Sequence, residues 1–241
     1  MAPELFKLIQ LCWYFFRLVG RAAAGARPAK RKLTELFMES LYERTQLPVV
    51  RPPEVHAEIL IAPQRITDAY VLMPERFTLL TDKELFALLA LFRHKAPRDV
   101  LEVGTYRGGS ALHFFLNSPP TTKITSLDRD FQSLSRDVEK QLLASGRFEL
   151  WQISSEQIDE KRHAEAFDFI FIDGSHEYLD VRRDTEKCLA MLREDGMIVW
   201  DDYNPAFPGV FRTLNELRHR GYDLRNIEGT SLVYYQALPN F

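Results

Sequence analysis

Four side chains that could bind a metal ion or move a proton follow two apolar runs in the second half of the chain. Asp173 and His176 come after the run FDFIFI, and Asp201 and Asp202 come after the run MIVW. Short apolar runs of this composition predict buried strands. Because neighbouring strands lie about 4.8 Å apart, carboxylates that end two adjacent strands could converge on one ion.

The three carboxylates and the imidazole suit two different chemical roles, metal binding and proton transfer. Oxygen ligands with room left for water or substrate suit Mg²⁺, so we expect Asp173, Asp201 and Asp202 to bind it, with Ca²⁺ or Mn²⁺ as alternatives. A cation chelated by two substrate oxygens lowers the pKa of a hydroxyl. His176 is then the natural general base, because its ordinary pKa is near 6.5. In the alternative, these residues cap a helix or face solvent and no metal is used.

A glycine-rich turn earlier in the chain indicates a pocket for a nucleoside. The residues from Glu102 to Gly109 read EVGTYRGG and follow a β-rich run. Glycines let a ligand approach the backbone, and free amides at the start of the next helix favour an anionic group such as a carboxylate. Asp128 lies about 24 residues beyond Gly104 at the end of the next predicted strand. There its carboxylate could accept hydrogen bonds from ribose hydroxyls.

The glycine spacing separates two classes of nucleoside cofactor. A dinucleotide fingerprint has the form G-x-G-x-x-G, whereas three residues separate Gly104 from Gly108 in this chain. The acidic Glu102 is also unfavourable beside a pyrophosphate, but it suits the cationic amino group of a methionine. An NAD-dependent oxidoreductase is therefore the less favoured alternative.

The motif Glu102-x-Gly104-x-x-x-Gly108 resembles motif I of the class I S-adenosylmethionine-dependent methyltransferases. This resemblance implies that Gly104, Gly108 and Ser110 line the methionine end of S-adenosylmethionine and that Asp128 binds its ribose. It also implies a Rossmann-like fold and a transferase activity.

The adenine side departs from the pattern of that superfamily. An acidic residue usually follows the third strand there, whereas this chain has Gln152, Ile153, Ser154 and Ser155. We retain Ser154 as the candidate contact to the adenine.

The later motifs resemble those of metal-dependent O-methyltransferases that modify sugars of macrolide antibiotics (macrocin-type), and those of cephalosporin-hydroxylase-like relatives. The resemblance spans about residues 80–203 and includes the sequence DGSHEY from Asp173 and the sequence DDY from Asp201. It implies the same metal ligands, with His176 as the base. The implied reaction is O-methylation of a hydroxyl on a small molecule such as a sugar, a polyol or a phenolic natural product. A metal-independent methyltransferase of the same fold remains an alternative.

These motifs need a parallel sheet that brings them to one edge. Five β-rich runs alternate with helical patterns, at residues 99–103, 123–127, 148–153, 167–172 and 197–200. Such alternation predicts parallel strands joined by right-handed crossovers, with ligands bound beyond the carboxyl ends of the strands. Thr81 and Glu84 form a capping-box pattern, which predicts that a helix begins near Asp82. We therefore expect a doubly wound, mostly parallel α/β sheet, followed by a helix near 210–220 and a strand near 231–236.

Length and composition fit one such domain. The chain has 241 residues, which we divide into an N-terminal helical extension or lid (1–65) and a methyltransferase domain (66–241). A net charge of −3 argues against an open nucleic-acid surface, so we expect a small-molecule substrate. Two cysteines suggest neither a disulfide framework nor a zinc site, and we expect a cytoplasmic protein.

The first 32 residues contain an apolar segment followed by a basic cluster. Residues 5–19 are strongly apolar but contain Lys7, Gln10 and Arg17, and they are too short to span a membrane as a helix. A linker or lid with three prolines separates a second predicted helix, near 33–44, from the domain. We favour a helix over 5–19 that packs on its own domain, on a second subunit or over the site. The alternative is an amphipathic helix held on an anionic membrane by the basic cluster at 21–32, either in the enzyme or in a non-catalytic binding protein. A signal peptide is less favoured because of Glu4.

Liposome co-sedimentation tests the membrane alternative. Peripheral binding through residues 5–32 predicts that the full chain sediments with anionic vesicles and that a chain lacking residues 1–32 does not. The full chain remaining in the supernatant would exclude this form of membrane contact.

Overall fold

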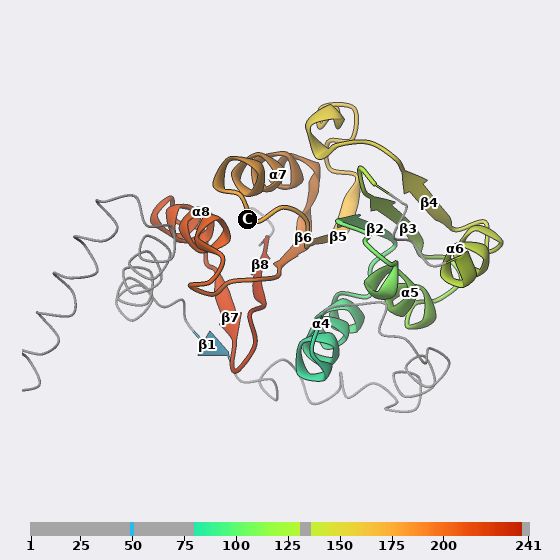
Figure 1. Ribbon diagram of the computed structural model, residues 1–241, viewed down its shortest axis with the longest axis horizontal. Coiled ribbons are helices and arrows are strands. Elements are labelled where there is room, and N and C mark those ends of the chain that lie inside the picture. Colours follow the sequence, from blue (N-terminus) through green and yellow to red (C-terminus); the bar gives the residue numbers. More distant parts are fainter. Residues whose placement is uncertain (1–48, 51–79, 131–135, 238–241) are drawn as a thin grey trace, which may run out of the picture.

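The computed structural model describes residues 49–50, 80–130 and 136–237, and eight strands in these ranges form one sheet (Figure 1). The strands are β1 (Val49–Val50), β2 (Asp99–Val103), β3 (Lys123–Leu127), β4 (Phe148–Trp151), β5 (Phe167–Ile172), β6 (Leu192–Trp200), β7 (Arg225–Ile227) and β8 (Val233–Gln236). The helices are α4 (Asp82–Lys95), α5 (Gly109–Leu116), α6 (Arg136–Leu143), α7 (Tyr178–Met191) and α8 (Pro208–His219), with a short 3₁₀ helix, η3, at Ser155–Gln157.

The strand order confirms a doubly wound, mostly parallel sheet. Across the sheet the order is β1-β7-β8-β6-β5-β2-β3-β4, and β8 is antiparallel to both of its neighbours. The chain proceeds outward from β2 through β3 to β4, then returns to the other side of β2 and continues through β5 to β6. The direction therefore reverses between β2 and β5, and such a switch point opens a crevice at the carboxyl ends of the strands.

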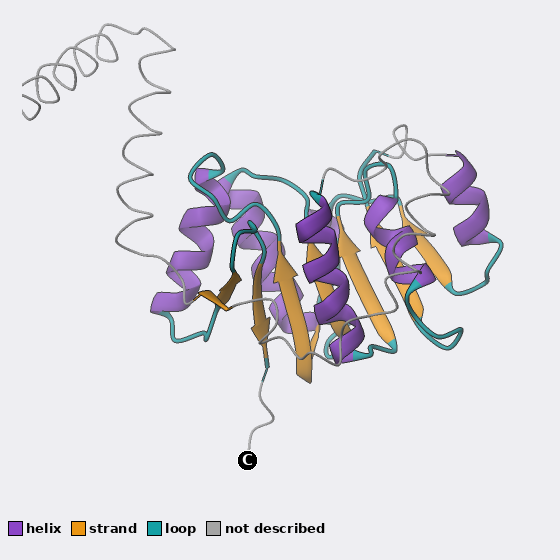
Figure 2. Cartoon of the chain, turned by 90° about the horizontal axis from the view of Figure 1, so that it is seen from below, coloured by secondary structure: helices purple, strands orange, loops and turns teal. Residues whose placement is uncertain are grey.

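Alternating apolar residues on the central strands build two core layers. Phe169 and Phe171 of β5 pack on the side of α4, α5 and α6, whereas Ile170 and Ile172 pack on the side of α7 and α8. Figures 1 and 2 show these two groups of helices on opposite faces of the sheet. Side chains of a strand point alternately to its two faces, so a central strand covered on both sides must be apolar throughout. This burial fixes the ends of β5 and β6, and with them the side chains that follow.

The start of α4 confirms the predicted capping box. The Thr81 amide donates to Glu84 Oε2 at 2.9 Å, and the Glu84 amide donates to Thr81 Oγ1 at 3.3 Å. Glu84 also accepts hydrogen bonds at Oε1 from the Ser231 amide (3.0 Å) and hydroxyl (2.7 Å). One carboxylate thus caps the helix and ties it to the loop before β8.

Several elements differ from the sequence prediction, among them β7, which was not predicted, and β8, which begins at Val233 rather than near residue 231. Val49 and Val50, expected in an irregular linker or lid, form a strand that pairs with β7, because two β-branched residues suit a sheet edge. β6 begins at Leu192 rather than at residue 197; its polar start is held by Arg193, which contacts Asp168 at 2.7 Å. β4 ends at Trp151, since the chain then turns into η3.

The helices predicted at 5–19 and 33–44 and the basic cluster at 21–32 lie outside the described residues. None of the helices in the described part of the chain is long and apolar enough to cross a membrane.

Candidate cofactor and metal site

A cavity of about 670 Å³ lies at the carboxyl ends of β2, β3, β4 and β5. Five of the residues singled out from the sequence line it: Gly104, Asp128, Ser154, Asp173 and His176. Its volume is typical of a site for a small molecule or cofactor. It also lies beside the switch point between β2 and β5, where the sheet topology places a ligand.

The turn after β2 requires glycine at two positions. Gly104 has a φ of 100°, and a Cβ atom there would lie 2.0 Å from the carbonyl oxygen of Asp173. Gly108 has a φ of 82° and stands at the N-cap of α5 without a side-chain cap. Only glycine adopts these conformations readily. The uncapped amides at the start of α5 remain suited to an anionic group.

Glu102 lies behind this turn and is fully buried. Its Oε2 accepts a hydrogen bond from the Ser126 hydroxyl, whereas its Oε1 has no hydrogen-bond partner. Burial raises the pKa of Glu102 to about 7, although the hydroxyls of Ser110 and Ser126 act in the opposite direction. Glu102, Gly108 and Ser110 are not among the residues that line the cavity. All three are buried.

Asp128 fixes the shape of the same turn. Its Oδ2 accepts hydrogen bonds from the amides of Thr105 (3.0 Å) and Tyr106 (2.9 Å), and its Oδ1 accepts from the amide of Asp130 (2.9 Å). An ionised carboxylate offers about four acceptor positions. Acceptor capacity therefore remains on Asp128 for a ligand hydroxyl in the cavity.

Ser154 lines the cavity, but its polar groups belong to a local cap. Its Oγ accepts from the amide of Glu156 (3.4 Å), and its own amide donates to Gln157 Oε1 (2.9 Å). This capping box starts η3 directly after β4.

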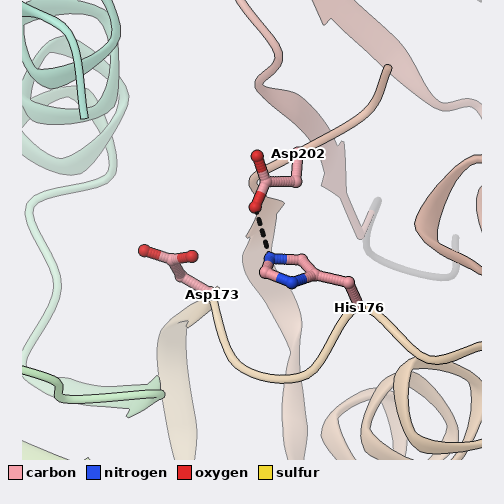
Figure 3. Close-up of side chains that lie close together, drawn as sticks. All are labelled: Asp173, His176 and Asp202. Atoms are coloured by element: carbon pink, nitrogen blue, oxygen red, sulfur yellow. Dashed lines mark hydrogen bonds and ion pairs between the residues drawn. The ribbon is translucent and has the colours of Figure 1, made fainter. Parts of the chain in front are cut away.

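An acidic cluster opens onto the same cavity. Among the described residues, Asp173, His176 and Asp202 place one potential ligand atom each within 4.8 Å of the others (Figure 3). His176 Nε2 lies 2.6 Å from Asp202 Oδ2, and the His176 ring stacks on Phe207 with centroids 4.3 Å apart. Asp202 has a φ of 62°, a left-handed conformation that Asp tolerates better than most residues and that is often found at functional sites.

The electrostatics of this cluster favour a cation. Burial, reinforced by Asp201 and Asp202, raises the pKa of Asp173 well above its ordinary value. The hydrogen bond to Asp202 raises the pKa of His176, so the imidazole partly supplies the missing positive charge. Carboxylates this close repel one another unless they bind protons or a cation.

Asp201 is oriented differently from Asp202. Its Oδ1 accepts a hydrogen bond from the Asp202 amide (2.7 Å) and lies 2.6 Å from the Ser231 hydroxyl, whose one proton is shared with Glu84. The structure therefore does not bring Asp201, predicted as a metal ligand, into the group formed by Asp173, His176 and Asp202. Burial raises the pKa of Asp201 to about 6, although the bond from Ser231 acts in the opposite direction. Ser231 also links Asp201 to Glu84 of α4.

Three residues contribute to the site although their sequence context did not predict this role. Glu84 and Ser231 reach it from elements far away in the sequence, and only the capping role of Glu84 had a local signal. Asp184 lines the cavity from within α7, where it looks like any other acidic residue of a helix.

Residues 101–203 match the sequence model of a methyltransferase domain family. No sequence among the curated proteins matches the chain. Among solved structures, a methyltransferase of Podospora anserina with bound S-adenosylhomocysteine has 16% sequence identity and a TM-score of 0.58, covering 83% of this chain and 94% of that one.

Two further similar structures are those of O-methyltransferases. An O-methyltransferase of Bacillus cereus in complex with S-adenosylhomocysteine has 18% identity and a TM-score of 0.54, covering 76% of this chain and 94% of that one. A TDP-rhamnose 3'-O-methyltransferase of calicheamicin biosynthesis has 17% identity and a TM-score of 0.55, covering 84% and 92%. The chain therefore has the class I methyltransferase fold, and its residues 101–203 are similar to a methyltransferase domain family.

The close approach at Gly104 gives a testable prediction. Strain and overpacking should lower the free energy of unfolding of Gly104→Ala by about 2–5 kcal/mol. Gly146→Ala is the matched control: its φ of 68° is also left-handed, but nothing lies within 4 Å of the added Cβ. In the control, the free energy of unfolding should fall by about 1–2 kcal/mol. Chemical denaturation measures both, and equal losses would show that the contact with Asp173 is not limiting.

Proposed function

We propose that this chain is an S-adenosylmethionine-dependent O-methyltransferase that uses a divalent cation to methylate a hydroxyl of a small molecule. One observation carries the proposal. Asp173 and His176 belong both to the acidic cluster and to the wall of the nucleoside-type cavity. A methyl donor in the cavity and an acceptor held by the cluster would therefore meet at these two residues.

The residues around the cavity fit S-adenosylmethionine. The unpartnered Oε1 of Glu102 suits a cationic amino group, which it would reach through a water molecule because Glu102 is fully buried and does not line the cavity. The start of α5 suits the carboxylate of the methionine, and Asp128 suits the ribose hydroxyls. S-Adenosylmethionine, when bound, supplies a methyl group on a positively charged sulfur.

The donor set of the cluster fits a divalent cation. Asp173 and Asp202 would hold it. Asp201, the third carboxylate predicted from the sequence, lies outside this group and would have to turn away from Ser231 to reach the same ion. Carboxylate oxygens favour Mg²⁺ or Mn²⁺. When bound, such a cation lowers the pKa of a hydroxyl on the acceptor.

His176 would act as the general base at Nε2 once a cation occupies Asp202 Oδ2, because Nε2 would then no longer donate its proton to that carboxylate. The acceptor oxygen forms a bond to the methyl carbon while the carbon–sulfur bond breaks, and the hydroxyl proton passes to His176. Phe207, stacked on the imidazole, limits its rotation and would keep Nε2 directed at the cluster.

The acceptor class follows from the same geometry. Two neighbouring oxygens on one molecule can chelate a cation, which favours sugars, polyols and phenolic natural products. The likeness to a TDP-rhamnose O-methyltransferase supports a sugar acceptor. A metal-independent methyltransferase is the second candidate, because the His176–Asp202 pair is itself an arrangement that can orient a base.

Manganese binding and turnover test these assignments together. We expect calorimetry to show that the wild type binds Mn²⁺ and that Asp202→Asn weakens binding at least about tenfold. Asp223→Asn is the control and should leave Mn²⁺ affinity unchanged, because Asp223 is exposed and precedes β7, at the edge of the sheet opposite to the cluster. His176→Ala should keep its Mn²⁺ affinity. With an acceptor such as catechol or TDP-rhamnose, it should form S-adenosylhomocysteine about 10²–10⁴ times more slowly than the wild type.

Each alternative has its own outcome. Loss of Mn²⁺ affinity in His176→Ala would make His176 a ligand rather than the base. Turnover that persists in EDTA, together with no Mn²⁺ binding, would support the metal-independent candidate.

A further inference from the structure

Asp184 is a buried acid that the proposed reaction does not use. It lies in the second turn of α7 and lines the cavity, yet its residue surface is only 3% exposed. Its Oδ1 has no hydrogen-bond partner. A buried acceptor without a donor costs free energy, and such groups in folded proteins usually have a partner or await one.

The two cations that lower the pKa of Asp184, Arg183 and Lys187, are hydrogen-bonded elsewhere. Lys187 donates to the carbonyl oxygens of Glu156 and Ile158, both at 2.7 Å, and to that of Ser155 at 3.2 Å. Arg183 donates to Glu156 and, at 3.4 Å, to Asp180. These contacts hold η3 and the start of α7 in place. They leave Oδ1 of Asp184 for a donor that enters from the cavity.

The pKa of Asp184 agrees with this environment. Burial raises it above the ordinary value, while the hydroxyl of Ser155 acts in the opposite direction. A hydrogen-bond donor on a ligand would compensate part of the desolvation that the carboxylate undergoes.

The order of the strands indicates which part of the ligand reaches Asp184. The cavity wall runs from Gly104 and Asp173 after β2 and β5, past Asp128 after β3, to Ser154 after β4. With the methionine at the first pair and the ribose at Asp128, the base of the nucleoside lies towards β4 and η3. Asp184 comes from α7, which packs against η3. The Ser154 Oγ, our candidate from the sequence, already accepts a hydrogen bond in the cap of η3, and a neutral hydroxyl is a weaker acceptor than a carboxylate.

We infer that Asp184 accepts a hydrogen bond from the exocyclic amino group of the adenine and so selects adenine over a 6-oxopurine. This inference rests on the proposed function. A carboxylate attracts the amino group at position 6 of adenine. It repels the carbonyl oxygen that hypoxanthine carries at the same position.

A pair of ligands that differ at this one group tests the inference. Calorimetry measures binding of S-adenosylhomocysteine and of its deaminated analogue S-inosylhomocysteine to the full chain. We expect the wild type to prefer the adenine ligand by about 10-fold to 100-fold, the range for a hydrogen bond to a charged group. In Asp184→Asn, whose amide offers both a donor and an acceptor, the preference should fall to about threefold or less.

Matched variants separate recognition from structure. Glu186→Gln, two residues further along α7 and exposed, should keep the wild-type preference. Asp184→Ser serves as a second variant should Asp184→Asn fail to fold. If Asp184 had a purely structural role, its substitution would weaken the binding of both ligands alike and leave the ratio of the two dissociation constants unchanged.

The outcomes distinguish this inference from the proposed function. Equal binding of the two ligands by the wild type, or an undiminished preference in the folded Asp184 variants, would overturn the role of Asp184 alone. Binding of neither ligand by the wild type would overturn the proposed function itself.

Discussion

The close approach of the turn after β2 to the backbone after β5 is the constraint on which the site depends. The Asp173 amide donates to the Val103 carbonyl at 2.8 Å, and the Gly104 amide donates to the Leu127 carbonyl at 2.8 Å. These bonds extend the pairing of β2 with β5 and β3 just beyond the strands. The cofactor turn and the first carboxylate of the acidic cluster therefore share one rigid edge, and Gly104 is the residue that makes room for it.

A concentration of negative charge is the second feature of this edge. Asp201, Asp202, Glu102 and Glu84 all raise the pKa of Asp173, after burial itself. Within the described residues, these carboxylates accept hydrogen bonds from hydroxyls and amides, such as those of Ser126 and Ser231, and from His176. Neutral donors compensate only part of the cost of burying carboxylates. Cationic ligands, an amino group near Glu102 and a metal ion near Asp173, would compensate much of the remainder.

Local sequence signals predicted the parts of the fold that depend on local physics. Apolar runs located β2, β3 and β5 to the residue, and the Thr81–Glu84 pattern located the start of α4. Strand alternation then placed Asp173 and Asp202 at one edge. The sequence could not show which carboxylate oxygens converge, because that depends on side-chain directions set by tertiary contacts. Asp201 contacts Ser231, and Asp184 lines the cavity from a helix. Neither contact produces a recognisable pattern in the sequence around the residue.

The central claim is that the cavity binds the adenosyl moiety of a methyl donor rather than a dinucleotide. Calorimetric titration of the full chain with S-adenosylhomocysteine and, separately, with NAD⁺ tests it most directly. We expect saturable binding of one S-adenosylhomocysteine per chain and no binding of NAD⁺ at the same concentrations. Binding of NAD⁺ without binding of S-adenosylhomocysteine would contradict it.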